Sequence, residues 1–572
     1  MLEDIELNAI QDENARQLIR RLLNLIEKLS ADLRDAQAEN QALRDEINHL
    51  KGEQGKPKVK ANKRPDASSK HSSEKERKKS RARHKAKKKA ELKIDREEVV
   101  QVKPETLPAD ARFKGYEEVV VQDILVKTDN VRFRKEKYYS ASKGKTYLAK
   151  LPRGYEGQFG PGVKALIPAL YFGMGSSEPK ILEFFANVGV QISKGQLSNL
   201  LIENQDKFHA ESDAVYESGL RSSVWQHSDD TLTRVNGENQ HCHVVCNPVY
   251  SAYRTQPHKN RLSVLDVLRN GRPRRFRLNQ DALVLLENVQ LSQKTRQSLQ
   301  ACSSEQEMDE ADFEKQLTWM LPRLGKQQRK EITDAAAIAA YWAEEKWPVV
   351  DILLCDDAPQ FNKLTRWMML CWVHEGRPYK KLHPVVSLHR QLLDDFLKRF
   401  WYYYHELLAY KQKPSETERI RLEAVFDDLF ATQTGYVNLD ERIAKTRAKK
   451  AALLLVLKHP GLPLHNNPAE LGVRRRVRKR DVSFGPRTEK GRRAWDTFMT
   501  LAETARKLGV SFYAYLRDRI TGEDAIPPLA ELVTQAASQL GLQQLRPAPK
   551  SGSLHAKSQR AQLFTQWRLS ND

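Results

Sequence analysis

The 572-residue sequence has little cysteine and no long apolar run. Its five cysteines are odd in number and thinly spread, which excludes a disulfide framework and is typical of a reducing compartment. No apolar stretch approaches the roughly 18 to 20 residues of a membrane span. The start, MLEDIELNAI, is acidic and has no apolar secretory core. These absences predict an intracellular, cytoplasmic protein without a membrane partner.

Positive charge, by contrast, is abundant. The sequence has 96 Lys and Arg against 74 Asp and Glu, a formal net charge of +22, which indicates a polyanionic partner such as nucleic acid. More than half of this excess lies in residues 51–94, where large apolar side chains are almost missing. We predict that residues 52–94 are a disordered basic linker that contacts phosphates. A linker that acts only as a spacer is the alternative.

A heptad pattern starts at residue 19 and continues to residue 50. β-Branched residues recur at the a positions, leucine dominates the d positions, and the one polar a residue is Asn40, a combination that favours a parallel dimer. Residues 1–51 are therefore predicted to form a dimerising coiled coil, and the alternative is a long helix packed on its own chain. The predicted interface consists of Ile19, Leu22, Ile26, Leu29, Leu33, Asn40, Leu43, Ile47 and Leu50.

Two small domains are predicted to follow the linker. Residues 95–155 alternate apolar and polar side chains, with SKGK as a hairpin turn, and predict a small β-rich domain. Residues 156–221 have a helical pattern in which KILEFFANV, a turn at Gly189 and a helix capped by Ser193 suggest a helix-turn-helix. We predict that this segment is a DNA-binding domain, and a helix pair packed for structural reasons is an equally good interpretation of that pattern.

Paired aspartates follow two apolar segments that read as strands. SVWQHSDDT precedes an Asn236-Gly237 hairpin and ends in Asp229 and Asp230, and WPVVDILLCDD ends in Asp356 and Asp357. Buried carboxylates are costly unless they are paired or bound to metal, so these aspartates suggest a site. A turn or a helix cap is the usual role of a single such pair.

A third carboxylate stands in HNNPAELGVRRRVRKR, residues 465–480. Glu470 can simply close a helix start capped by Asn467, with Pro468 at the first position. Alternatively, Glu470 joins Asp229 and Asp356 in holding two Mg²⁺ or Mn²⁺ ions about 4 Å apart for phosphoryl transfer. The basic residues that follow would then hold DNA phosphates: Arg474, Arg475, Arg476, Arg478, Lys479 and Arg480.

These segments, in this order, resemble the transposases of the insertion sequence sixty-six family, bacterial DDE recombinases with a ribonuclease-H-like core. The resemblance runs from the coiled coil to about residue 520. SDDT resembles the family's Asp-Glu-Thr segment, with Asp229 in the place of the first catalytic acid. DDAPQFN resembles the segment of the second acid, with Asp356 first, and CWVHEGRPYKKL is similar to the Cys-Trp-x-His segment that follows it.

The third acid of the family lies in D-N-N-x-x-E-R, which HNNPAEL matches at Asn466, Asn467 and Glu470. The most specific match is TLAETARKLGVSFYAYLRD, which is similar to the family's closing helices. His465 replaces the usual Asp and Leu471 the usual Arg, so a supporting hydrogen bond or phosphate contact is lost or replaced.

No zinc is expected. The family often carries a cysteine zinc-binding module before its core, but no cysteine precedes Cys242 here. In HCHVVC, strand alternation places Cys242 and Cys246 on one face and the two histidines on the other, and no second ligand pair follows. The aromatic run from Trp401 to Tyr404 is expected in a core, with base stacking as the alternative.

Together these patterns predict a multidomain α+β/α protein. The resemblance implies that residues 222–520 form a ribonuclease-H-like DDE catalytic core with helical insertions at about 273–345 and 376–460, and residues 521–572 are expected to form a C-terminal tail. The resemblance also implies a nucleoid-associated bacterial transposase that cleaves terminal inverted repeats and joins them to target DNA, as a homodimer or higher assembly, with or without helper proteins of the same element. The alternatives are a nuclease without strand transfer and a DNA-binding protein that has lost catalysis.

Overall fold

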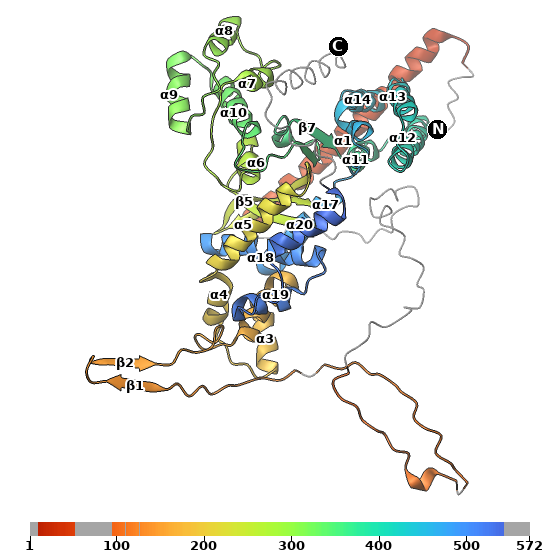
Figure 1. Ribbon diagram of the computed structural model, residues 1–572. Coiled ribbons are helices and arrows are strands. Elements are labelled where there is room, and N and C mark those ends of the chain that lie inside the picture. The colour runs from red at the N-terminus through yellow and green to blue at the C-terminus, as the bar shows by residue number, and fades with distance from the viewer. Residues whose placement is uncertain (1–9, 52–93, 109, 125, 543–572) are drawn as a thin grey trace.

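A mixed five-stranded sheet lies at the centre of the protein. The computed structural model describes residues 10–51 and 94–542 except 109 and 125, so nearly all of the predicted basic linker lies outside the described residues. The strand order is β5-β4-β3-β6-β7, with β3, β4 and β5 antiparallel and with β6 and β7 parallel to β3 (Figure 1). The strands are β3 (Trp225–Val235), β4 (Glu238–Asn247), β5 (Tyr250–Gln256), β6 (Ile352–Cys355) and β7 (Trp367–Leu370).

The predicted hairpin between the first two strands of this sheet is confirmed. Val235 pairs with Glu238, and Asn236 and Gly237 both have positive φ, as a two-residue turn of the Asn-Gly type requires. Alternation along β4 also holds, since Cys242 and Cys246 are both fully buried in one apolar cluster. His241 and His243 alternate with Cys242 along the strand and so lie on the other face of the sheet, as predicted.

Helices cover both faces of the sheet, and the side chains of β6 divide between two apolar clusters. Leu353 and Cys355 belong to the larger cluster, and Ile352 and Leu354 to the other. This alternation is what a strand buried on both faces shows. The larger cluster includes buried side chains of α2 (Pro161–Pro168), α3 (Glu178–Asn187), α4 (Lys194–Ile202), α5 (Asp206–Arg221), α6 (Arg261–Leu268), α18 (Glu489–Lys507), α19 (Phe512–Thr521) and α20 (Leu529–Gln539).

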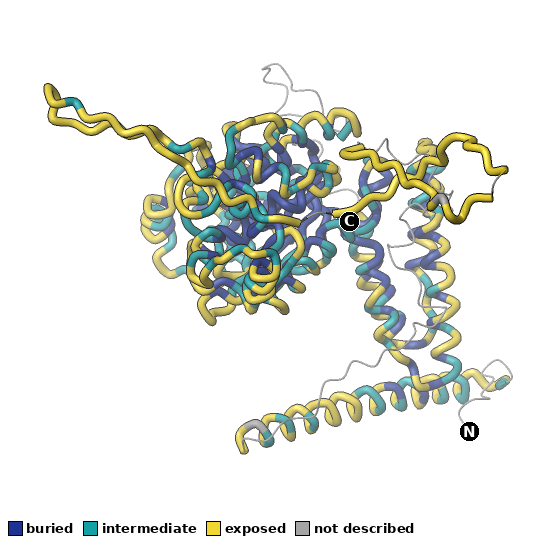
Figure 2. The backbone as a smooth tube through the Cα atoms, turned by 90° about the horizontal axis from the view of Figure 1, so that it is seen from below, coloured by how far each residue is buried: buried dark blue, intermediate teal, exposed yellow. Residues whose placement is uncertain are grey.

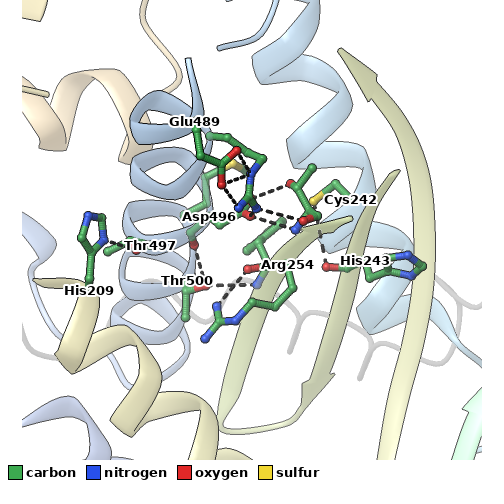
Figure 3. Close-up of polar contacts among 12 residues, drawn as sticks. His209, Cys242, His243, Arg254, Glu489, Asp496, Thr497 and Thr500 are labelled. Atoms are coloured by element: carbon green, nitrogen blue, oxygen red, sulfur yellow. Dashed lines mark hydrogen bonds and ion pairs between the residues drawn. The ribbon is translucent and has the colours of Figure 1, made fainter. Parts of the chain in front are cut away.

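The edge strand β5 is closed by side chains of α18. Backbone N–H groups of alternate strand residues donate to a row spaced four residues apart on the helix: Ser251 to Thr504 (3.3 Å), Tyr253 to Thr500 (3.0 Å) and Thr255 to Asp496 (2.8 Å). Figure 3 shows Asp496 and Thr500 in this row. An exposed edge strand invites pairing with other chains, and this helix removes the free donors.

Both insertions are helical, as predicted. The first contains α7 (Gln280–Leu285), α8 (Gln293–Ala301), α9 (Glu310–Met320) and α10 (Lys326–Trp342). The second follows α11 (Trp372–Lys380) and contains α12 (Ser387–Tyr410), α13 (Glu416–Phe430), α14 (Val437–Arg447), α15 (Lys450–Leu453) and α16 (Leu455–Lys458). They form separate lobes on opposite sides of Figure 1. In the aromatic run of α12, Trp401, Tyr403 and Tyr404 are buried in the core and Tyr402 is 68% exposed.

The predicted N-terminal helix is α1 (Glu13–Leu50), and most of its surface is exposed (Figure 2). Most of the predicted heptad interface is exposed in the described part of the chain, namely Leu22, Leu29, Leu33, Asn40, Leu43, Ile47 and Leu50. Ile19 and Ile26 pack partly against Val386 and Leu388 near the start of α12. One part of α1 therefore packs on its own chain, as in the alternative interpretation, and the heptad stripe remains exposed.

Glu27 fixes α1 to the body. Its carboxylate is buried and accepts hydrogen bonds from the backbone N–H groups of Val385 (2.9 Å) and Val386 (2.8 Å). Val386 is the N-cap of α12, and no side chain of α12 itself caps that end. A residue of α1 therefore supplies the acceptor that the start of α12 needs.

The small β-rich domain predicted for residues 95–155 is not formed within the described chain, and this prediction is wrong. The segment contains a single two-stranded ribbon, β1 (Lys137–Ser140) and β2 (Lys145–Leu148), with the predicted turn between the strands, and a short 3₁₀ turn (Pro104–Thr106). Apolar side chains along it are exposed, for example Val121 at 80% and Phe113 at 76%. Alternation alone cannot form a domain, because each strand also needs neighbours on which to bury its apolar face.

Residues 156–221 form α2 to α5 and a π-helical turn at Ala169–Gly173. The predicted helix pair is α3 and α4, with Gly189 at φ +80° in the turn. Ser193 caps α4 and forms a capping box with Gln196, as the sequence predicted. DNA contact by this pair stays a prediction.

The C-terminal part of the body differs from the predicted tail. Residues 521–572 were predicted as a tail, but α20 lies within them and buries Leu529, Val533 and Ala537, one side chain per helical turn, in the larger apolar cluster. Residues 543–572 lie outside the described residues. None of the helices among the described residues is both long enough and apolar enough to cross a membrane.

Candidate active site

The parallel pair β3–β6 places the two predicted catalytic aspartates side by side. His227 pairs with Leu354, and continuing this register by two residues brings Asp229 level with Asp356. Asp229 lies within β3, and Asp356 directly follows the end of β6. Both strands run in the same direction, so the two carboxylates lie at the same end of the parallel pair.

The charges of these acids act on one another. The pKa of Asp229 is raised to about 7, mainly by burial and in addition by the nearby negative charges of Asp356, Asp230 and Glu470, while the backbone N–H of Asp230 lowers it. Such a carboxyl remains partly protonated near neutral pH. A bound cation would stabilise its anionic form. The three acids predicted from the sequence are therefore brought together.

Glu470 does not close its helix. In α17 (Asn467–Ser483) the N-cap is Asn466, which makes no side-chain cap hydrogen bond, so the capping box proposed as the alternative is absent. The carboxylate instead accepts a hydrogen bond from Arg377 (2.8 Å) and lies 3.5 Å from Nδ1 of His374. Both partners come from α11, which begins next to the end of β7.

Asn466 connects the start of α17 to β3 and so positions Glu470. Its side-chain N–H donates to the carbonyl of Ser228 (2.8 Å), the residue before Asp229, and its amide oxygen lies 3.0 Å from Nδ1 of His227. Burial lowers the pKa of His227 to about 3, so the imidazole is neutral and Nδ1–H is the donor. The backbone N–H of Asn466 donates to the Cys371 sulfur (3.2 Å), and its side chain is fully buried.

The second aspartate of each pair is held by a lysine. The Asp230 carboxylate lies 3.1 Å from Nζ of Lys259 and accepts from Gln360 (2.8 Å). Asp357 lies 2.6 Å from Nζ of Lys449. Within the described part of the chain no ion pair involves Asp229 or Asp356, so the two members of each pair differ in their surroundings.

The donor atoms fit a hard divalent cation. Asp229, Asp356 and Glu470 offer only carboxylate oxygens, which Mg²⁺ and Mn²⁺ prefer. Among the described residues, the group whose ligand atoms all lie within 4.8 Å of one another is Cys371, His374 and Glu470. Burial raises the pKa of the Cys371 thiol to about 12, so this sulfur is a poor ligand, because a metal binds the thiolate.

Two of the six basic residues predicted to contact DNA are buried, and the prediction is wrong for them. Arg476 is 0% exposed, pairs with Asp496 (3.3 Å) and lies over the Trp495 ring. Lys479 is 3% exposed, its ammonium is 3.1 Å from the centre of the Tyr171 ring, and burial lowers its pKa to about 7. These cations stabilise the packing of α17, because that face of the helix lies against the sheet and α18.

The other four basic residues of α17 face outward to different degrees. Arg474 and Arg478 are exposed and have no ion pair within the described chain, so they are free to contact phosphates. Arg475 is paired with Glu503, and Arg480 donates to the Leu232 carbonyl. The part of α17 that is available to contact a phosphate is therefore smaller than the run of arginines suggested.

The sequence reasoning missed Arg377, Lys259 and Lys449. Lys259 and Lys449 each lie in a segment without another site residue, and each is recognisable only through the carboxylate that it contacts. Arg377 had a weak signal, since it follows His374 by three residues on one face of α11, the spacing at which helical side chains meet a common partner.

Two comparisons with known proteins found similar sequences. A family model described as "Transposase IS66 family" matches residues 330–494, a range that contains Asp356 and Glu470. The uncharacterized protein y4jO of Sinorhizobium fredii (strain NBRC 101917 / NGR234) is 30% identical over 325 residues, which are 56% of this chain and 100% of that protein. No solved structure matches the chain.

Proposed function

Because the chain belongs to the transposase IS66 family, we propose that it is a DNA transposase that binds the terminal inverted repeats of its insertion sequence, cleaves the ends and joins them to target DNA. The observation that carries this proposal is the convergence of three acids from distant segments. Asp229, Asp356 and Glu470 act on one another electrostatically, while lysines hold the neighbouring aspartates.

The reaction is phosphoryl transfer, first to water and then to a DNA hydroxyl. Two bound Mg²⁺ or Mn²⁺ ions would activate the attacking oxygen and stabilise the leaving oxygen. Asp229 and Asp356 would hold them from the sheet, and Glu470 would complete the ligand set from α17. Arg377 is 48% exposed beside Glu470, so its guanidinium can share its hydrogen bonds between this carboxylate and a substrate phosphate.

The strand order supports a ribonuclease-H-like core. Three antiparallel strands are followed across the sheet by two parallel ones, and the proposed acids lie on the first strand, after the fourth strand in sequence and on a later helix. Binding to the nucleoid follows from DNA as substrate. We also propose a homodimer through the exposed heptad stripe of α1, with target DNA and any helper proteins bound to the assembled complex.

The test is a cleavage and joining assay with Mg²⁺ or Mn²⁺ on DNA that carries the gene with its native flanks. Asp356→Ala is expected to lower cleavage by about a thousandfold or more, since bound cations contribute several kcal/mol to the transition state. DNA binding should stay near the wild-type level. The matched control is Asp357→Asn, which changes the neighbouring carboxylate that Lys449 holds and should retain most of the cleavage.

The outcomes separate the possible functions. Cleavage by Asp356→Ala at the wild-type rate would contradict the assignment. Cleavage without joined products from the wild type would indicate a nuclease. A wild type that binds the ends but never cleaves them, with or without other proteins of the element, would indicate a DNA-binding protein that has lost catalysis.

A further inference from the structure

The ribbon β1–β2 has both of its faces exposed. Tyr138 pairs with Tyr147 on one face, and Tyr139 pairs with Thr146 on the other. The three tyrosines are 64%, 69% and 44% exposed for Tyr138, Tyr139 and Tyr147. Figure 1 shows the ribbon extending away from the body, and Figure 2 shows it almost entirely exposed. An isolated two-stranded hairpin is only marginally stable in water, so this ribbon needs a partner outside the described fold.

The charge of the ribbon and its flanks is strongly positive. Residues 132–153 contain one acidic residue, Glu136, and eight basic residues, all exposed: Arg132, Arg134, Lys135, Lys137, Lys143, Lys145, Lys150 and Arg153. No carboxylate within the described residues forms an ion pair with any of these eight. This differs from α17, where most of the basic side chains are already engaged, and it leaves the cations free for a polyanion.

The ribbon leaves the body beside the α3–α4 pair. A Cβ at Gly189, in the turn between these helices, would lie 3.8 Å from the Thr128 side chain. Phe133 packs edge-to-face on Tyr155 with ring centres 5.1 Å apart. The base of the ribbon therefore packs next to the helix pair, while the tip of the ribbon, at Ser142 to Lys145, is free.

We propose that residues 132–153 form a DNA-binding arm whose ribbon enters a groove of duplex DNA. This inference rests on the proposed function for its partner and names a DNA contact outside the active site. Two strands side by side have the width that the major groove of B-DNA accepts. Lysines and arginines on both strands contact the phosphates of the groove walls, and tyrosine hydroxyls add hydrogen bonds to the backbone.

The test is the affinity of the full chain for a duplex carrying one native end of the element, measured by fluorescence anisotropy over a series of salt concentrations. The double variant Lys143→Glu with Lys145→Glu should bind about tenfold more weakly or worse. It should also reduce the slope of log affinity against log salt by about 1.8, the value for two lost phosphate contacts. This binding needs no divalent cation, so a chain that binds in this way but never cleaves would contradict the proposed function alone.

The control is Lys294→Glu with Lys326→Glu, which makes the same charge change at exposed lysines of α8 and α10. Replacing residues 137–148 by a short Gly-Ser linker is a second variant, and it should weaken binding while leaving the thermal unfolding of the body unchanged. An unchanged affinity and salt slope in both arm variants, or an equal loss in the control, would overturn the proposal. A loss of dimer mass in the arm variants would overturn it in favour of pairing between two copies of the chain.

Discussion

At the scale of single residues, the two members of each aspartate pair differ in whether a lysine lies beside them. Lysines pair with Asp230 and Asp357, whereas within the described residues Asp229 lies among other acids and accepts a hydrogen bond from the backbone N–H of Asp230. A buried anion in such a place lowers the stability of the metal-free protein. Cation binding would restore this stability. Such a site favours metal binding at the expense of the stability of the metal-free protein.

This arrangement predicts a pH-dependent affinity for Mn²⁺. The folded pKa of Asp229, about 7, lies above its unfolded value, so this group favours the folded state at low pH and that contribution is lost as pH rises toward 7. A proton on Asp229 competes with the metal. Affinity measured by calorimetry should therefore rise by up to about tenfold per pH unit below pH 7 and level off above it.

Asp229→Asn is the control for that measurement, because the amide cannot titrate. It should bind Mn²⁺ weakly and with much less dependence on pH. In the metal-free protein at pH 8 it should also raise the urea midpoint of unfolding above that of the wild type. A wild-type affinity that does not change between pH 5.5 and 7 would exclude Asp229 as a ligand that exchanges a proton for the metal.

At the scale of elements, α1 and α17 each use two faces for different purposes. In α17, Arg476 and Lys479 pack inward while Arg474 and Arg478 remain exposed. In α1, Leu23 and Glu27 are buried against the second insertion, and the leucines of the heptad stripe are exposed. Because the two faces of α1 are distinct, one helix can fix its own body and pair with a second copy at the same time.

The exposed stripe of α1 predicts that Leu29→Lys with Leu33→Lys converts a dimer to a monomer. Both side chains are 59% exposed in the single chain, so the change should not unfold the body. Light scattering measures the mass. Ala38→Lys, at an outward heptad position of the same helix, is the control and should remain dimeric. A wild type that is monomeric at micromolar concentration, or a double variant that keeps the dimer mass, would contradict the predicted coiled coil.

At the scale of the whole molecule, the sequence predicted elements better than it predicted their surroundings. The Asn236-Gly237 hairpin, the Ser193 cap and the helical insertions follow from local rules, and all three are observed. The convergence of the acids came from strand context and from family resemblance. Each of these features depends on residues close together in the chain or on a known order of motifs.

The predictions that were wrong also have physical reasons. Burial of Arg476 depends on Asp496 and Trp495, which belong to a helix that the sequence does not connect to it. The β domain failed because alternation shows that a strand can form but not whether neighbours exist to cover it. The tail was misread because Leu529 and Val533 are informative only when the body on which they pack is known.

The central claim is that Glu470 completes a metal centre with Asp229 and Asp356. The most direct test is the cleavage and joining of native ends by the wild type and by Glu470→Gln, with Mg²⁺ and with Mn²⁺. Glutamine keeps the size of the side chain and could still close a helix start, but it removes the charge that a cation needs. The account predicts cleaved and joined ends from the wild type and a loss of about a thousandfold in the variant. Equal activity of the two proteins would contradict it.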